Sequence, residues 1–307
     1  MSKAVAVIED VLDNGQPVVG NYLAMLIISL SKALRRLLVG AMAISACLWA
    51  ADKKPGAAKW ADNYNIPLWD EGKVPLAQGN GPLDSPFLTV FMPPEDKRNG
   101  ASVIIAPGGS NIMLMYGGEG MEVAERYNDW GAAAFVLTYR LSPRYGENAR
   151  VLDGKRAVAL LRSLAADWKL DPNRIGFAGF SAGSSMARSV VAAAGPGDPA
   201  AADPIDRFNS RPDYAVLVYS PGRATPGEQL KNFPPTFLLA AAADKGAANG
   251  SAQLFIDLNK AGAIAELHLY QKGRHGFGAA FASPEFSPWM PALKHFLEQG
   301  KFLPGAE

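Results

Sequence analysis

Residues 174–194, RIGFAGFSAGSSMARSVVAAA, contain the pattern that decides the fold. An apolar run of strand character leads into Gly179-Phe180-Ser181-Ala182-Gly183, and a segment of helix-forming residues follows. The pattern glycine–x–serine–x–glycine is short and arises by chance, so its weight comes from this position between a strand and a helix. A strand and a helix that meet in such a turn pack so closely that side chains at positions 179 and 183 would collide with their neighbours. We therefore predict a nucleophile elbow with Ser181 at its tip.

After about Trp60, short β-rich apolar runs alternate with runs of helical period, which is the signature of βαβ units. The expected strands are residues 87–91, 102–106, 133–138, 175–179, 215–219, 236–241 and 265–270. The expected helices are residues 120–130, 152–168, 182–194, 251–261 and 291–298. Most of the strands are apolar throughout, as strands covered on both faces should be. We predict one α/β domain over residues 60–307, a doubly wound and mostly parallel sheet with helices on both faces.

A serine becomes nucleophilic near neutral pH only when a base takes its proton, and imidazole has a pKa that suits this task. Among the 3 histidines, His275 lies in a glycine-rich stretch, GRHGFG, just after the last expected strand. His268 falls within that strand and is expected in the core or at the sheet edge, and His295 is expected on a helix surface. We predict that His275 is the general base.

The base in turn needs a carboxylate that fixes its tautomer and stabilises the imidazolium. Asp244 follows the apolar strand at residues 236–241, at the carboxyl end of that strand. The chain order is then serine, aspartate, histidine, which is the order of α/β hydrolases and differs from those of chymotrypsin-like and subtilisin-like enzymes. We predict an α/β-hydrolase fold with a catalytic triad of Ser181, Asp244 and His275.

Acyl transfer also requires hydrogen-bond donors for the negative oxygen that develops in the transition state. Pro107-Gly108-Gly109-Ser110 follows the early strand at residues 102–106, where α/β hydrolases have such a loop. We assign the backbone N–H groups of Gly109 and Ser110 to this role, together with the N–H of Ala182 at the helix start after the elbow. A simple glycine turn is the alternative interpretation of residues 107–110.

The composition excludes several other functions. The chain has 30 Lys and Arg against 29 Asp and Glu, a net charge of +1, so it has no basic field for nucleic acid. Its only cysteine, Cys47, lies ahead of the predicted domain, which excludes an internal disulfide, a cysteine-based zinc site and a thiol nucleophile there. The histidines also lack the spacing of an HExxH helix. We expect a mechanism that uses neither a metal nor a cofactor.

Residues 1–59 are expected to be an N-terminal extension with an export signal. Basic residues between Lys32 and Arg36 precede the apolar run 37–50, LLVGAMAISACLWA. This run has the length of a signal-peptide h-region and is short for a helix that spans a bilayer.

Two interpretations of the cleavage site remain open. Ile44-Ser45-Ala46-Cys47 resembles a bacterial lipobox, whose cysteine carries lipid in the mature chain, and ordinary signal-peptidase cleavage after Ala50 is the alternative. Both predict export to the periplasm, the extracellular space or a lipid-anchored place in a bacterial envelope. A lipid on Cys47 would be the chain's only attachment to a membrane.

The body of the sequence resembles the esterase and lipase group of α/β hydrolases that includes acetylxylan-esterase-like and feruloyl-esterase-like proteins, several of which act on plant polysaccharides. The likeness runs from about Ile66 to Phe302. It is carried by Ile66-Pro67-Leu68-Trp69, Pro107-Gly108-Gly109, Tyr139-Arg140-Leu141-Ser142-Pro143, Asp171-Pro172-Asn173-Arg174-Ile175, Gly179 to Gly183, Leu267-His268-Leu269-Tyr270 and His275-Gly276-Phe277-Gly278.

The resemblance implies the same triad, residue by residue, on Ser181, Asp244 and His275. The sequence departs from the group's pattern at two places. Ser110 stands where a third glycine is usual, and Lys245-Gly246-Ala247 replaces the proline-containing run that usually follows the acid.

The predicted function is that of a serine carboxylic-ester hydrolase, which acts on short-chain acyl esters through an acyl-enzyme on Ser181. The resemblance points to a small-molecule or carbohydrate ester, with acetyl groups on sugar as one substrate. A peptidase or thioesterase with the same triad and an exported binding protein without activity are the alternatives. Residues 111–116 are either an apolar acyl pocket or core, and Trp69 and Trp289 are either sugar platforms or core.

Overall fold

The structure is a computed structural model that describes residues 64–222, 225–279 and 289–305. The described residues belong to one compact unit, Asn63–Glu307. The predicted extension, its apolar run and Cys47 lie outside the described residues. No helix in the described part is long and apolar enough to cross a bilayer.

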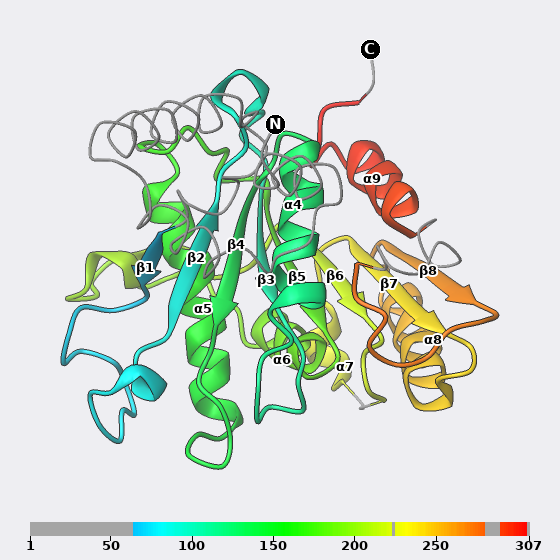
Figure 1. Cartoon of the computed structure of the whole chain (residues 1–307), viewed down its shortest axis with the longest axis horizontal. Coiled ribbons are helices and arrows are strands. Elements are labelled where there is room, and N and C mark those ends of the chain that lie inside the picture. The colour runs from blue at the N-terminus through cyan, green and yellow to red at the C-terminus, as the bar shows by residue number, and fades with distance from the viewer. Residues whose placement is uncertain (1–63, 223–224, 280–288, 306–307) are drawn as a thin grey trace, which may run out of the picture. The chain divides into compact units, whose positions relative to one another are not determined.

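The centre of this unit is an eight-stranded sheet in the order β1-β2-β4-β3-β5-β6-β7-β8 (Figure 1). The strands are β1 Asn65–Pro67, β2 Phe87–Phe91, β3 Ser102–Ala106, β4 Ala133–Thr138, β5 Ile175–Phe180, β6 Tyr214–Val218, β7 Thr236–Ala241 and β8 Ala265–Tyr270. β2 pairs antiparallel with β1 and with β4, and every pair from β4 to β8 is parallel. The carboxyl ends of the parallel strands therefore lie along one edge of the sheet.

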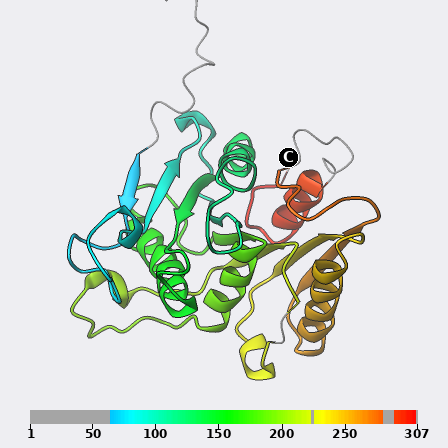
Figure 2. The same ribbon diagram turned by 60° about the horizontal axis from the view of Figure 1, so that its bottom comes forward.

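Helices cover both faces of the sheet, as Figure 2 shows. The helices are α4 Glu122–Asp129, α5 Glu147–Leu164, α6 Ala182–Ala192, α7 Gly227–Leu230, α8 Lys245–Lys260 and α9 Trp289–Gln299, with a π-helical turn η3 Gly117–Met121 and 3-10 turns η1 Pro82–Asp84, η2 Glu95–Lys97 and η4 Pro204–Arg207. α4 and α9 pack on one face of the sheet, and α5, α6 and α8 pack on the other.

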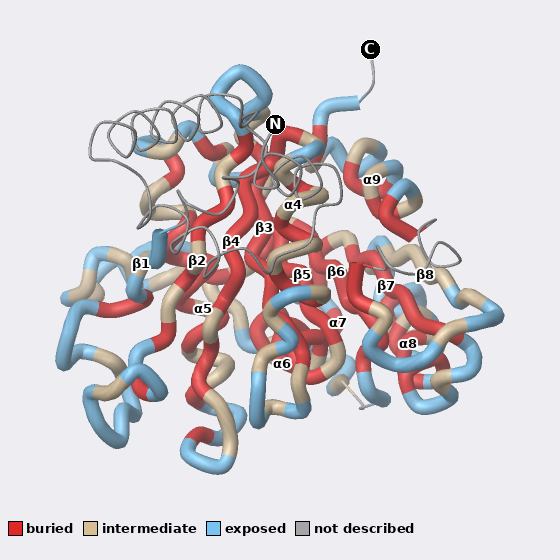
Figure 3. The backbone as a smooth tube through the Cα atoms, viewed as in Figure 1, coloured by how far each residue is buried: buried red, intermediate tan, exposed pale blue. Residues whose placement is uncertain are grey.

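The two helical layers bury two hydrophobic cores, one on each face, so the inner strands β2 to β7 are buried along most of their length (Figure 3). The edge strands β1 and β8 are only partly buried. Neighbouring residues of one strand alternate between the cores: Val103 and Ile105 belong to the α4 side, and Ile104 belongs to the α5 side. Burying each such side chain fully stabilises the fold by roughly 1.5–3 kcal/mol. Two-sided burial explains why these strands are apolar at every position instead of every second one.

The predicted α/β class and the doubly wound, mostly parallel sheet are confirmed, and the differences are local. β1 was not predicted, β5 extends to Phe180, and β6 begins and ends one residue earlier than expected. α5 begins at Glu147 instead of Leu152 and ends at Leu164 instead of Trp168, and α6 ends at Ala192. α8 begins at Lys245 instead of Ser251, in a glycine-containing segment that hid its start.

The 3-10 turn η1 is tied to the segment before α5 through one buried carboxylate. Asp84 accepts hydrogen bonds from the Tyr145 hydroxyl, from Arg144 Nε at 2.7 Å and from the Gly81 N–H at 3.1 Å. These partners, with Tyr145 first, hold the pKa of Asp84 below its ordinary 3.8, although burial acts in the opposite direction.

Because the folded-state pKa of Asp84 lies below the unfolded-state value, its carboxylate contributes stability above the unfolded pKa and loses it as the pH falls through the folded pKa. We expect Asp84→Asn to lower the Tm at neutral pH, and its difference from the wild type to shrink below about pH 4. Thermal denaturation across this pH range measures the effect. Asp70→Asn is the control, because Asp70 is exposed in its pair with Lys73. An Asp84→Asn deficit that is independent of pH would contradict the prediction.

Candidate active site

The predicted elbow joins β5 to α6 and holds Ser181 in a strained backbone conformation, with φ 51° and ψ −115°. A Cβ on Gly183 would lie 2.0 Å from the carbonyl oxygen of Ala106, and a Cβ on Gly179 would lie 2.4 Å from the carbonyl oxygen of Gly183. Both glycines are therefore required by close backbone packing. The Ser181 N–H donates to the carbonyl oxygen of Val218 at 3.1 Å, which fixes the elbow to the end of β6.

The structure brings His275 to the serine from the loop after β8. The distance from Ser181 Oγ to His275 Nε2 is 2.6 Å, which is a hydrogen bond. The imidazole ring packs against the ring of Tyr219, with 4.8 Å between the ring centroids. The side chain of His275 is 47% exposed, so a substrate can reach it from solvent.

Asp244 lies on the other side of the imidazole, with its Oδ2 2.5 Å from His275 Nδ1. It follows β7 and is the N-cap of α8, where its Oδ1 accepts the N–H of Ala247 at 3.4 Å. The helix and the histidine therefore use different oxygens of one carboxylate. The first turn of α8 is formed by Lys245-Gly246-Ala247, the run that differs from the pattern of the related esterases. Asp244 still faces the base.

The predicted oxyanion loop follows β3 and lies against the elbow. A Cβ on Gly108 would lie 2.8 Å from the Cβ of Ser181, so only glycine allows this approach. Gly109 has φ 126° and Ser110 has φ 56°. The positive φ at Ser110 explains why related esterases usually have a glycine at this position, since glycine adopts a positive φ without strain. Within the described residues, no group accepts a hydrogen bond from the N–H of Gly109, Ser110 or Ala182.

The structure shows which of the apolar residues with two interpretations belong to the core. In the stretch 111–116, Leu114 and Tyr116 are partly buried against the cores, whereas Ile112, Met113 and Met115 are half or more exposed and are not core. Trp69 is 8% exposed and Trp289 is fully buried, so both are core residues and neither is a platform for sugar.

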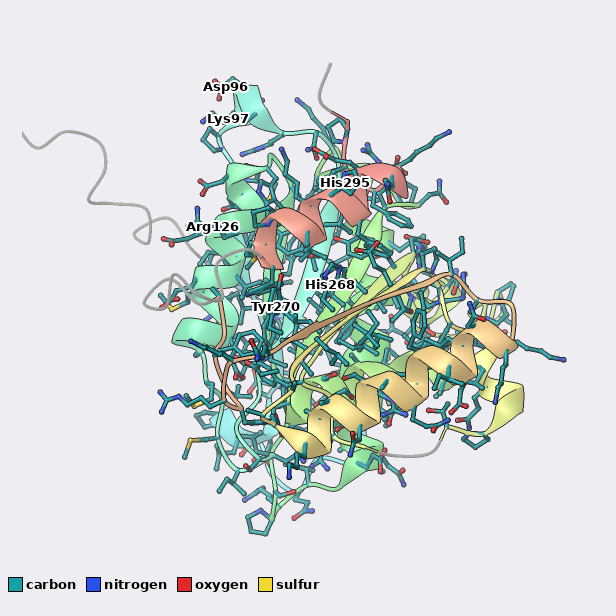
Figure 4. The ribbon with its side chains drawn as sticks, turned by 90° about the vertical axis from the view of Figure 1, so that its right-hand side faces the viewer. Asp96, Lys97, Arg126, His268, Tyr270 and His295 are labelled. Carbon is teal, nitrogen blue, oxygen red and sulfur yellow. The ribbon has the colours of Figure 1, made fainter. Side chains whose placement is uncertain are left out.

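The other two histidines lie on β8 and on α9 (Figure 4). His268 is on the edge strand β8, where its Nε2 is 2.6 Å from Glu266 Oε1 and its ring stacks on Phe237. His295 is exposed on α9 and contacts Gln299. Across the described residues, no three His, Cys, Asp or Glu side chains gather in a way that could hold a metal ion.

Two residues of this region were missed from the sequence, Glu119 in η3 and Tyr219 directly after β6. The Glu119 carboxylate is buried and accepts hydrogen bonds from the Gly108 N–H at 2.7 Å and from the Tyr219 hydroxyl at 2.5 Å. The available signal for Tyr219 was its place at the carboxyl end of the expected strand 215–219, at the same sheet edge as Ser181. An acid inside the glycine-rich segment GGEGM was the signal for Glu119.

The fold and the site together define an α/β hydrolase, and the comparisons with known proteins agree. The family model BD-FAE matches residues 88–197. An acetyl ester-xyloside bifunctional hydrolase from Caldicellulosiruptor lactoaceticus is 30% identical and has a TM-score of 0.71, over 78% of this chain and 97% of that one. This chain belongs to the BD-FAE family of α/β hydrolases.

The chain is also similar to two more distant relatives. A thermophilic esterase from the Planctomycetes species Thermogutta terrifontis has a TM-score of 0.60 at 19% identity, over 73% of this chain and 91% of that one. An acetylxylan esterase from Xylanibacter ruminicola is 24% identical over 72% of this chain and 47% of its own length. The chain thus spans about half the length of this curated relative.

Proposed function

We propose that the chain hydrolyses short-chain acyl esters, with acetyl groups on carbohydrate as the substrate class, through an acyl-enzyme on Ser181. The observation that carries the proposal is the continuous hydrogen-bonded series from Ser181 through His275 to Asp244, with distances of 2.6 Å and 2.5 Å. The names of two relatives, an acetyl ester-xyloside hydrolase and an acetylxylan esterase, support the choice of acyl group and alcohol.

In the acylation step, Ser181 Oγ attacks the ester carbonyl carbon while His275 Nε2 takes the hydroxyl proton. Asp244 accepts a hydrogen bond from Nδ1–H, so that Nε2 is the free acceptor and the imidazolium is stabilised once it forms. The tetrahedral oxyanion is stabilised by the N–H groups of Gly109, Ser110 and Ala182. The imidazolium then gives its proton to the alcohol oxygen, the carbon–oxygen bond breaks, and the alcohol leaves.

In the deacylation step, water attacks the acyl carbonyl and His275 takes one of its protons. Collapse of the second tetrahedral intermediate returns that proton to Ser181 Oγ and releases the carboxylic acid. We also propose that the exposed Ile112, Met113 and Met115 contact the substrate, because they stand on the loop that carries Gly109.

The ester preference is tested with p-nitrophenyl acetate, butyrate and octanoate, together with acetylated xylan. We expect kcat/KM to fall by about tenfold or more from acetate to octanoate, because a short-acyl site excludes the longer chain. Acetate release from acetylated xylan is expected as well, and the rate with Ser181→Ala measures the background release that does not depend on the proposed nucleophile. Preference for octanoate, or acetate release that is confined to the small synthetic ester, would contradict the proposed substrate class.

A further inference from the structure

A buried carboxylate connects two parts of the active site that are far apart in the chain. Glu119 is 4% exposed and lies in the π-helical turn η3. Its Oε2 accepts the N–H of Gly108 at 2.7 Å, and its Oε1 accepts the Tyr219 hydroxyl at 2.5 Å. Single π-helical turns are rare and often occur at functional sites.

The same network reaches the loop that carries the base. The Tyr219 hydroxyl accepts the N–H of Gly278 at 3.2 Å. The Tyr219 ring packs against His275 and against Phe277, with centroid distances of 4.8 Å and 4.9 Å. The turn that holds Glu119 also contacts this loop directly, since the Gly118 carbonyl accepts the N–H of Ala279 at 2.8 Å.

We infer that Glu119 is a positioning residue for the proposed reaction, because its carboxylate sets Gly108 of the oxyanion loop and, through Tyr219, the imidazole of His275 relative to Ser181. Gly108 lies so close to Ser181 that a small shift of this loop would move the oxyanion donors relative to the nucleophile. Transition-state stabilisation depends steeply on that geometry. The inference rests on the proposed acyl-enzyme mechanism.

The direction of the two hydrogen bonds explains why a carboxylate is needed. The Gly108 N–H can only donate. Burial, and next the adjacent Glu119, raise the pKa of Tyr219 well above its ordinary value, so the phenol keeps its proton and donates it. Two donors therefore converge on Glu119, and an ionised carboxylate is a side chain that accepts on both oxygens. A glutamine of the same size would offer an NH₂ group at one of these positions.

The test uses Glu119→Gln and Tyr219→Phe, which keep the size of each side chain, with Tyr214→Phe as the matched control. Tyr214 is also a buried tyrosine, at the opposite end of β6, and it donates to the Ser102 carbonyl at 3.2 Å, away from the elbow. Steady-state kinetics on p-nitrophenyl acetate, the pH profile of kcat/KM and the Tm are measured for each variant.

We expect Glu119→Gln and Tyr219→Phe each to lower kcat by about ten- to a hundredfold with KM changed less than about threefold. Because the two residues act through one network, the double variant should be no worse than about the poorer single variant. Tyr214→Phe should keep its kcat within about twofold of the wild type. Its Tm should fall by about as much as the Tm of Glu119→Gln and Tyr219→Phe, because each variant loses a buried hydrogen bond.

Two results would overturn the inference. One is a folded Glu119→Gln or Tyr219→Phe protein with wild-type kcat, and the other is a Tyr214→Phe protein that loses as much kcat as they do, which would indicate general destabilisation. If Ser181→Ala keeps the wild-type rate, the proposed mechanism fails instead. If Ser181→Ala is inactive while Glu119→Gln is fully active, the inference about Glu119 fails and the proposed mechanism stands.

Discussion

Ser181→Ala is expected to lower kcat for p-nitrophenyl acetate by a factor of about 10⁴ to 10⁶. The substitution removes the oxygen that lies 2.6 Å from His275 Nε2 and leaves no group to form the acyl-enzyme. Alanine meets the same backbone strain at φ 51° as serine does, so the elbow should keep its shape. Residual catalysis by the oxyanion donors and by substrate binding would set the remaining rate.

The matched control for this prediction is Ser184→Ala, in the first turn of α6. The Ser184 hydroxyl is buried and has no hydrogen-bond partner in the described part of the structure, so its removal should be neutral or slightly stabilising. Kinetics and mass spectrometry after treatment with a p-nitrophenyl phosphonate separate the two variants. Wild type and Ser184→Ala should gain the phosphonyl mass, and Ser181→Ala should not. A Ser181→Ala protein that keeps more than about 1% of kcat would mean that another group is the nucleophile.

The sheet was predictable because its strands are buried on both faces. Ile104 and Ile105 point into different cores, and both must be apolar. The run 102–106 is therefore recognisable as a strand from its own sequence, without knowledge of the strands that pair with it. β1 lacks that signal. It is three residues long, pairs only with β2 at the edge of the sheet, and contains Pro67. Its existence depends on the strand beside it, which the local sequence does not describe.

The beginning of α8 was hidden for a different reason. Glycine is a poor helix former, and Gly246 and Gly250 made residues 245–250 read as a loop. In the structure a Cβ on Gly250 would lie 2.5 Å from the Cα of Gly222, so tertiary packing selects glycine within a helix. Propensity is a weak guide where two backbones approach each other this closely.

The proposed triad was found from the sequence because each member follows a recognisable strand, and the carboxyl ends of parallel strands share one edge. The network behind it has no such signature. Glu119 and Tyr219 are separated by 100 positions in the chain, and their hydrogen bond depends on how η3 lies over the end of β6. Such pairings are set by tertiary structure, and neither residue carries a motif. The catalytic roles of Ser181, Asp244 and His275 stay predictions until the variants are measured.

Asp244→Asn is expected to lower kcat by a factor of about 10³ to 10⁴ with a small change in Tm. Asparagine has nearly the same shape and caps a helix about as well as aspartate, so α8 should still begin at residue 245. It carries no charge to stabilise the imidazolium, and its NH₂ group can face Nδ1 and favour the tautomer in which Nε2 bears the proton. That tautomer cannot accept the proton of Ser181.

Asp203→Asn is the control for the same exchange of a helix-capping aspartate at a site away from the triad. Asp203 is the N-cap of η4 and accepts the N–H of Ile205 at 2.9 Å, and it pairs with Arg156, with no contact to the triad. Its replacement should reduce the Tm, because the buried Arg156 loses a charged partner, while kcat stays near the wild-type value. Among the described residues, no second carboxylate lies within ion-pair distance of His275. If Asp244→Asn loses less than about tenfold in kcat, the orientation of His275 must come mainly from its packing on Tyr219, and the charge of Asp244 would be secondary.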